Sequence, residues 1–245
     1  MNLPNKIKLA LEDIYSKTSP VSIFLYGSQA RGDATPKSDY EVGILYKAIE
    51  KIHRFDLQEM HSIENLNIYP FIYEDFIQYS LDSPFPEALY LRSLFDGGAF
   101  TLYGKKVVEE TSPPAILTSD LLEEISFEIA YALGALLSFR KKDISTASDQ
   151  FVKAIMYGSR LLIMLRKKKY VLRYDEIITN TVKLYIPDEY KDLILRTSKI
   201  RKGTNSLQLQ DIYTGISYLN QVIRTEIKKM LGQGNDVVLE GVRKT

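Results

Sequence analysis

The chain has 245 residues, of which 45% are hydrophobic and 26% charged, and its formal net charge is +1. These values are typical of a soluble protein with one large or two smaller domains, and the near-neutral charge disfavours a nucleic-acid binder. The sequence contains no cysteine, which excludes disulfides, thiolate metal sites and cysteine nucleophiles. No apolar run approaches the roughly 20 residues of a membrane span, and the amphipathic N-terminus is unlike a signal peptide, so we expect a cytoplasmic protein.

The first half of the chain alternates between helical and strand patterns. Apolar residues recur at helical spacing near the N-terminus, and short apolar runs bounded by glycine or polar residues indicate strands. The predicted elements are a helix over 5–16, a strand over 21–26, a short helix over 28–32, a strand over 40–46, a helix over 50–60, a strand over 67–73, a helix opening at Glu74-Asp75, a helix over 86–95 and a strand over 100–103. Pro70 cannot donate a hydrogen bond to a ladder, so its strand is expected at a sheet edge or at a bulge.

The pattern changes beyond the segment Ser112-Pro113-Pro114, whose composition is typical of a linker. Helical periodicity dominates from there, and no strand pattern is evident. Helices are predicted over 120–141, opening with Asp120 as a cap, and over 147–168, 174–185, 188–201 and 207–231. We therefore predict an α+β protein, in which a small mixed sheet flanked by helices (residues 1–110) is followed by an all-helical bundle (residues 118–235).

The chemically informative stretch is FLYGSQARGDATPKSDYEVGILY, residues 24–46. A buried strand ends at Gly27-Ser28, where glycine permits close approach of a phosphate to backbone N–H groups and a helix N-terminus favours negative charge. Further on, Asp39 and Glu41 open the next strand, and strand alternation puts both carboxylates on the same face. Two adjacent carboxylates repel each other unless a cation lies between them, and their hard oxygens suit Mg²⁺ or Mn²⁺.

This segment resembles the motif of the polymerase-β nucleotidyltransferase superfamily, and in particular small bacterial and archaeal members such as the minimal nucleotidyltransferases and the aminoglycoside adenylyltransferases. The matching residues are Gly27-Ser28, Arg31-Gly32 and Ser38-Asp39-x-Glu41. The resemblance implies a nucleotidyltransferase fold and an enzyme that moves a nucleoside monophosphate from an NTP, by default ATP, to an acceptor and releases pyrophosphate. It also implies that Asp39 and Glu41 hold the metal ions, that Ser28 contacts the β- or γ-phosphate, and that Arg31 and Ser38 assist in nucleotide binding.

Members of this superfamily usually carry a third carboxylate on the strand that follows the acidic pair. This sequence has no acidic residue at the matching place. The strand over 67–73 puts Asn67 or Tyr69 there, and neither is acidic. Glu64 could substitute if the register slips, and Glu74 or Asp75 if the strand is short. If none does, the site is rearranged, takes its base from the acceptor or a partner, or is an inactive nucleotide-binding remnant.

The helical half resembles the HEPN-type partners of nucleotidyltransferases or the helical C-terminal domain of the adenylyltransferases. No histidine follows His61, so the histidine-dependent chemistry of HEPN ribonucleases is excluded. The basic run Arg166–Lys169 suits a helix C-terminus better than nucleic-acid binding. We therefore expect the acceptor of the transfer to be a hydroxyl group of a small molecule or a protein. The alternative to an enzyme is an antitoxin-like or regulatory protein that binds a nucleotide and transfers it weakly or not at all. In either case the helical domain is a candidate homodimer interface.

Overall fold

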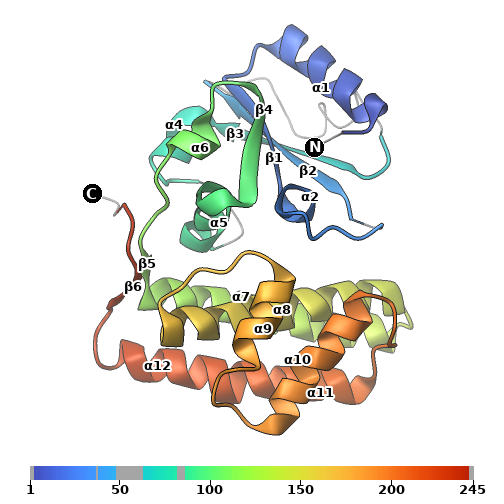
Figure 1. Cartoon of the computed structure of the whole chain (residues 1–245), viewed down its shortest axis with the longest axis vertical. Coiled ribbons are helices and arrows are strands. Elements are labelled where there is room, and N and C mark those ends of the chain that lie inside the picture. Colours follow the sequence, from blue (N-terminus) through green and yellow to red (C-terminus); the bar gives the residue numbers. More distant parts are fainter. Residues whose placement is uncertain (1–2, 37, 48–62, 82–85, 243–245) are drawn as a thin grey trace. The chain divides into compact units, whose positions relative to one another are not determined.

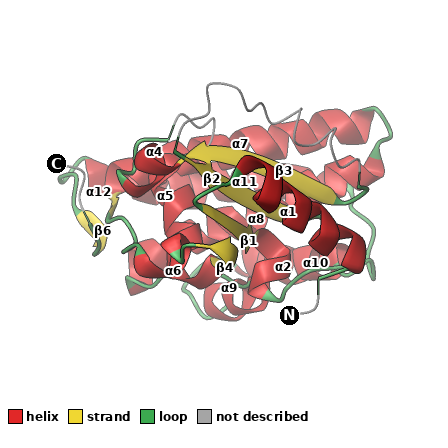
Figure 2. Ribbon diagram, turned by 90° about the horizontal axis from the view of Figure 1, so that it is seen from above, coloured by secondary structure: helices red, strands yellow, loops and turns green. Residues whose placement is uncertain are grey.

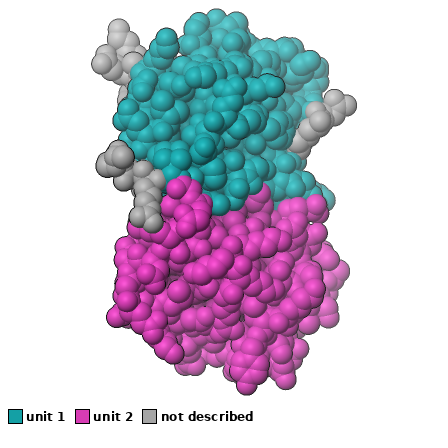
Figure 3. All heavy atoms as spheres, turned by 60° about the vertical axis from the view of Figure 1, so that its left-hand side comes forward, with its two compact units in different colours: residues 1–114, 242–245 teal, residues 115–241 magenta. Residues whose placement is uncertain are grey.

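The structure, a computed structural model, describes residues 3–36, 38–47, 63–81 and 86–242 of the chain. The chain forms two compact units, which Figure 3 colours separately. One comprises Met1–Pro114 together with Val242–Thr245, and the other comprises Ala115–Gly241. The C-terminal end of the chain therefore belongs to the same unit as the N-terminus.

The first unit is built on a mixed four-stranded sheet with the strand order β3-β2-β1-β4. Its strands are β1 (Ser22–Tyr26), β2 (Tyr40–Tyr46), β3 (Leu66–Ile72) and β4 (Ala99–Gly104). Strand β1 is antiparallel to both β2 and β4, whereas β3 is parallel to β2. Strand β3 lies at the edge, which confirms the position expected for Pro70, because an edge strand can leave one side of its backbone unpaired.

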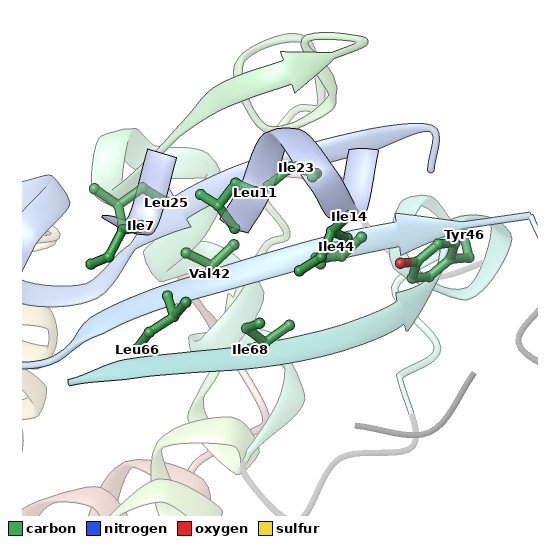
Figure 4. Close-up of a cluster of buried hydrophobic side chains, with 10 residues drawn as sticks. All are labelled: Ile7, Leu11, Ile14, Ile23, Leu25, Val42, Ile44, Tyr46, Leu66 and Ile68. Atoms are coloured by element: carbon green, nitrogen blue, oxygen red, sulfur yellow. The ribbon is translucent and has the colours of Figure 1, made fainter. Parts of the chain in front are cut away.

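Helix α1 (Asn5–Thr18) covers one face of this sheet (Figures 1 and 2). It begins after Pro4 and ends at Ser19, whose left-handed backbone terminates the helix. Its buried residues include Ile7, Leu11 and Ile14, which share one helical face and pack on strand residues such as Val42 and Ile44 (Figure 4). This packing fixes which face of β2 is turned toward α1.

The opposite face of the sheet packs on short helices and on the aromatic side chains that they carry. These elements are α4 (Tyr73–Ile77), α5 (Glu87–Ser93), the π-helical turn η1 (Leu94–Gly98) and α6 (Val107–Glu110). Phe24 of β1 lies against Phe76, and a Cβ at Gly43 would stand 2.1 Å from the Phe24 ring. The glycine on β2 therefore makes room for this ring between the two strands.

The second unit consists mainly of helices, as expected (Figure 1). They are α7 (Thr118–Arg140), α8 (Ile144–Lys167), α9 (Tyr174–Thr181), α10 (Asp188–Arg201) and a continuous run of α11 (Leu209–Ser217), the π-helical η2 (Tyr218–Arg224) and α12 (Thr225–Leu231). On α8, Phe151, Ile155 and Leu162 are buried on one face. A Cβ at Gly158 would lie 2.3 Å from Leu219 Cδ2, so this glycine permits the close packing that the sequence predicted.

The structure corrects two details of the second half. A two-stranded ribbon, β5 (Ile116–Leu117) with β6 (Val237–Leu239), interrupts the all-helical pattern. Strands this short carry too few residues to show a period of two. In addition, α7 begins two residues before Asp120, which accepts a hydrogen bond from the Leu117 backbone N–H at 2.7 Å from inside the first turn.

The helix predicted over 50–60 lies outside the described residues, as do His53 and His61. Within the described residues, the helices are too short or too polar to span a lipid bilayer.

Candidate functional site

The turn at Gly27 joins β1 to the short helix α2 (Gly27–Arg31) and brings the turn against Glu41. Gly27 has φ +73°, a left-handed conformation that glycine adopts without steric cost. In the β1–β2 ladder its neighbour Tyr26 pairs with Glu41. A Cβ built on Gly27 would stand only 1.8 Å from Glu41 Oε2, so the carboxylate occupies the space that any other residue would fill.

Ser28 follows in the first turn of α2. Its carbonyl accepts hydrogen bonds from the Gly32 and Asp33 backbone N–H groups, which closes the helix after five residues. Within the described part of the chain, the Ser28 hydroxyl makes no hydrogen bond. The macrodipole of a helix this short is small. Binding of a phosphate at this turn would therefore depend mainly on hydrogen bonds from the backbone N–H groups of the first turn and from the Ser28 hydroxyl.

The loop between α2 and β2 is held by its own side chains. The Ser38 hydroxyl accepts a hydrogen bond from the Thr35 backbone N–H at 2.8 Å, and the Gln29 amide donates to the Ser38 carbonyl at 3.2 Å. Ser38 therefore shapes the loop that leads into Asp39, while its predicted contact with a nucleotide remains a prediction.

Arg31 pairs with Asp33 at 3.3 Å, and the two side chains are only 11% and 6% exposed. Its guanidinium thus lies within the same loop rather than in open solvent. The predicted contact of Arg31 with phosphate oxygens would require it to share this ion pair or to break it.

Asp39 and Glu41 lie at the start of β2, on the side of the sheet away from α1. Tyr40 between them packs on the α1 side, and strand alternation directs its two neighbours to the other side. Asp39 is exposed and immediately precedes the strand, whereas Glu41 is half-buried. The turn at Gly27 and both carboxylates are therefore brought to one end of the sheet.

Asn67 stands where the third carboxylate was sought. In the parallel β2–β3 ladder it is in register with Glu41, and its side-chain amide donates a hydrogen bond to Asp39 Oδ2 at 3.0 Å. The sequence pointed to this position but gave no sign of the contact, because the contact depends on the strand register. The structure therefore shows two carboxylates and one amide at this end of the sheet.

The other candidates for a third acid lie elsewhere. Glu64 is exposed in the turn before β3. Glu74 and Asp75 belong to α4, beyond the opposite end of β3, and five strand steps of about 3.3 Å separate Asn67 from Ile72, or about 16 Å. Among the residues that the structure describes, no group of three or more His, Cys, Asp or Glu side chains could hold a metal ion.

Tyrosines lie beside the carboxylate of Glu41. The ring of Tyr26 makes edge-on contacts with Tyr69 and Tyr90, with centroids 6.1 and 6.2 Å apart. Burial raises the pKa of Tyr26 well above its usual value, and the nearby Tyr90 and Glu41 raise it further. Burial likewise raises the pKa of Tyr90. Both phenols stay protonated at neutral pH, so neither can accept a proton as a general base there.

The side chains at this end of the sheet suit a hard divalent cation. The carboxylates of Asp39 and Glu41 and the amide oxygen of Asn67 are the oxygen donors that Mg²⁺ and Mn²⁺ prefer. A cation would also offset the repulsion between the two carboxylates. The contact of Glu41 with Gly27 would place such a cation next to the turn that is expected to receive phosphates.

Comparisons with known proteins give a family match for part of the chain and a shared fold for most of it. Residues 5–79 match the nucleotidyltransferase domain family. Among solved structures, the chain is similar to spectinomycin adenyltransferase AAD(9) from Enterococcus faecialis, determined with ATP and spectinomycin, at 16% identity and a TM-score of 0.58, over 91% of this chain and 97% of that chain. A proposed nucleotidyltransferase from Sulfolobus solfataricus matches 29% of this chain and 67% of its own at 24% identity, with a TM-score of 0.25. A comparison with curated proteins gave no match.

At 16% identity, the likeness to the Enterococcus protein shows a shared fold. The family assignment comes from residues 5–79, which run from α1 to the end of α4 and contain the turn and both carboxylates. Residues 5–79, with Gly27, Ser28, Asp39 and Glu41 among them, thus match the nucleotidyltransferase domain family, while the likeness over the rest of the chain shows its fold.

Proposed function

We propose that the protein transfers a nucleoside monophosphate from an NTP, with ATP as donor and Mg²⁺ as cofactor, to a hydroxyl group of a small molecule or a protein. The observation that carries this proposal is the contact between the Gly27 turn and Glu41, with Asp39 at the same end of the sheet. ATP as donor is supported by the Enterococcus protein, whose structure contains ATP.

In this proposal the Gly27 turn and the Ser28 hydroxyl hold the triphosphate, and Asp39 and Glu41 hold the metal ions. A divalent cation there would neutralise charge on the phosphates during the transfer. The acceptor oxygen forms a bond to the α-phosphorus, and the bond from that phosphorus to the pyrophosphate oxygen breaks. The hydroxyl proton needs a base, which an amide cannot be, so Asn67 does not take it. The base then comes from the acceptor or from a partner.

Nucleic acid is not the acceptor in this proposal. In the basic run Arg166–Lys169, Arg166 is held by Glu226 at 2.6 Å and by the Tyr185 carbonyl at 2.8 Å. Lys167 donates to the Asn180 side chain at 3.2 Å. Two of the four residues of this run, Arg166 and Lys167, thus stabilise the helical unit.

The same proposal includes a cytoplasmic location, which the absence of cysteine supports. It also includes a homodimer that forms through the helical unit.

A second candidate function is that of a regulatory or antitoxin-like protein that binds a nucleotide and transfers it weakly or not at all. The amide of Asn67 in place of a third carboxylate favours this reading, because the site then lacks a base of its own.

The two functions are separated by incubating the protein with α-labelled NTPs, Mg²⁺ and either a small-molecule extract or candidate partner proteins. Label passed to an acceptor, lost in Asp39→Asn and Glu41→Gln and kept in the exposed control Glu64→Gln, supports the enzyme. Metal-dependent nucleotide binding without transfer supports the regulatory protein. Absence of any metal-dependent nucleotide binding would overturn both.

A further inference from the structure

The side chain of Asn67 lies at the candidate site, at the position where the family pattern expects a third carboxylate. It lies on edge strand β3, directly across the parallel ladder from Glu41. Its amide nitrogen is 3.0 Å from Asp39 Oδ2, so it contacts one carboxylate and neighbours the other. Among the described residues this is the one hydrogen bond to the side chain of Asp39.

Asp39 needs such a partner because of where it lies. It is exposed, precedes the first residue of β2, and so lacks the ladder that fixes the backbone of Glu41. An exposed carboxylate without a partner samples several rotamers, and ordering it on binding costs free energy. The amide supplies a donor without adding charge, and thus holds Asp39 beside Glu41 without increasing the repulsion between the two acids.

The presence of an amide instead of a carboxylate at position 67 also sets the charge of the site. Two carboxylates and an amide carry one negative charge less than three carboxylates, and the affinity of an oxygen site for a divalent cation rises with its number of charged ligands. The phosphates of an NTP supply the missing negative charge. A site of this composition therefore gains most of its cation affinity when the nucleotide is present.

We propose that Asn67 is a positioning residue, which holds Asp39 for the divalent cation and makes cation binding depend on the nucleotide. This rests on the proposed nucleotidyl transfer. The role differs from that of a catalytic base, because the amide neither accepts a proton nor replaces the charge of a carboxylate.

The test measures Mn²⁺ binding to the full chain by electron paramagnetic resonance, with and without a non-hydrolysable ATP analogue, and the melting temperature in EDTA and in Mn²⁺. The variants are Asn67→Asp and Asn67→Ala. The control is Gln78→Glu, which adds the same charge at an exposed position after α4, beyond the other end of β3. Cation binding and the EDTA melting temperature are both independent of turnover.

We expect wild type to bind Mn²⁺ weakly alone and at least about tenfold more tightly with the analogue. Asn67→Asp should bind Mn²⁺ alone about tenfold more tightly than wild type and melt at a lower temperature in EDTA, with the loss reversed by Mn²⁺. Asn67→Ala should lose about tenfold or more in Mn²⁺ affinity in the presence of the analogue. Gln78→Glu should match wild type.

Equal destabilisation of both Asn67 variants with and without Mn²⁺, at unchanged Mn²⁺ affinity, would show a merely structural role and overturn the proposal. If wild type binds Mn²⁺ with the analogue and the Asn67 variants do so equally well, only the role of Asn67 fails. If wild type binds neither ligand, the proposed nucleotidyl transfer fails as well.

Discussion

Gly27 and Gly32 both adopt φ +73°, yet their surroundings differ. A Cβ at Gly32 would meet nothing within 4 Å, whereas a Cβ at Gly27 would collide with Glu41 Oε2. Both glycines are therefore needed for a left-handed backbone conformation. Only Gly27 is also needed because its missing side chain leaves room for the carboxylate of Glu41. Substitutions at the two positions can therefore distinguish the effect of backbone strain from the effect of displacing the Glu41 carboxylate.

Replacing Gly27 with alanine should cost far more activity than replacing Gly32. Each substitution introduces left-handed strain of about 1–2 kcal/mol, which chemical denaturation would measure. Gly27→Ala should in addition displace Glu41 and lower nucleotide transfer about 100-fold, because small misplacements of reacting groups have effects of that size. Equal losses of activity in both variants would mean that the contact between Gly27 and Glu41 has no part in transfer.

Much of the candidate site could be predicted residue by residue, because its motif is local in sequence. The turn at Gly27 and the acids at Asp39 and Glu41 follow from residue type and strand alternation, and the structure brings them to one end of the sheet. The contact of Asn67 with Asp39 depends on the register of two strands joined by a long connection, which no local pattern encodes. The ion pair of Arg31 with Asp33 likewise depends on how the loop folds back.

Among the elements, the pair α7 and α8 buries an ionisable cluster. Glu124 and Glu128, one helical turn apart on α7, are 7% and 1% exposed. Arg160 on α8 faces them and lies over the rings of Tyr157 and Tyr170, at 4.5 and 5.2 Å. Burial raises the pKa of Glu124 to about 7 against the opposing effect of Arg160, and burial together with the charge of Glu124 raises the pKa of Glu128.

The stability of the helical unit should therefore fall as the pH rises from about 4.5 to about 7. In this window the unfolded chain has already ionised these acids, at their usual pKa of about 4.3, while the folded chain retains protons. The free energy of unfolding should decrease by on the order of 1–3 kcal/mol over that range, as measured by urea titration followed by circular dichroism. Glu124→Gln and Glu128→Gln should flatten this dependence.

The control for the two buried acids is Glu189→Gln, which replaces an exposed acid on α10 of the same unit. It should leave the pH dependence of wild type unchanged. A stability curve that rises between pH 4.5 and pH 7 in wild type, or that Glu124→Gln fails to alter, would contradict the assignment to this cluster.

Among the secondary-structure elements, the long helices could be predicted from the sequence more readily than the shortest strands. Helix α8 has apolar residues at helical spacing over many turns, so its core face follows from the sequence. The ribbon of β5 and β6 joins segments far apart in the chain, and its strands have two and three residues. Asp120 was misread as a cap preceding its helix because aspartate stabilises either the N-cap or the first turn.

At the scale of the whole molecule, the chain passes between the two units twice, and the two crossing points are neighbours. Pro114 forms a bridge with Val242, whose N–H donates to the Pro113 carbonyl at 3.0 Å. The buried side chain of Arg92 donates to the Pro114 carbonyl at 2.9 Å and to Asp96 at 3.1 Å. Arg92 thereby fixes the last residue of the outgoing segment to the first unit.

Replacing Arg92 with alanine should destabilise the first unit by about 1–3 kcal/mol, because it leaves the buried Pro114 carbonyl without its donor. It should also accelerate proteolysis in the segment 111–114, since the segment is then less firmly held. The control Asp96→Asn keeps the hydrogen bond to Pro114 and weakens only the half-exposed ion pair, so its effect should be smaller. Equal proteolysis rates in wild type and Arg92→Ala would refute this role.

The return of the polypeptide at Val242 makes the helical unit an insertion within the unit that carries the four-stranded sheet. A gene fragment that stops at Pro114 would therefore encode the four-stranded sheet without Val242, the residue that pairs with its final segment. A label attached at the exposed Val242 would report on the first unit, although most of the preceding sequence is helical bundle. For probes of the helices, an internal position such as the exposed Tyr185 is the better attachment point.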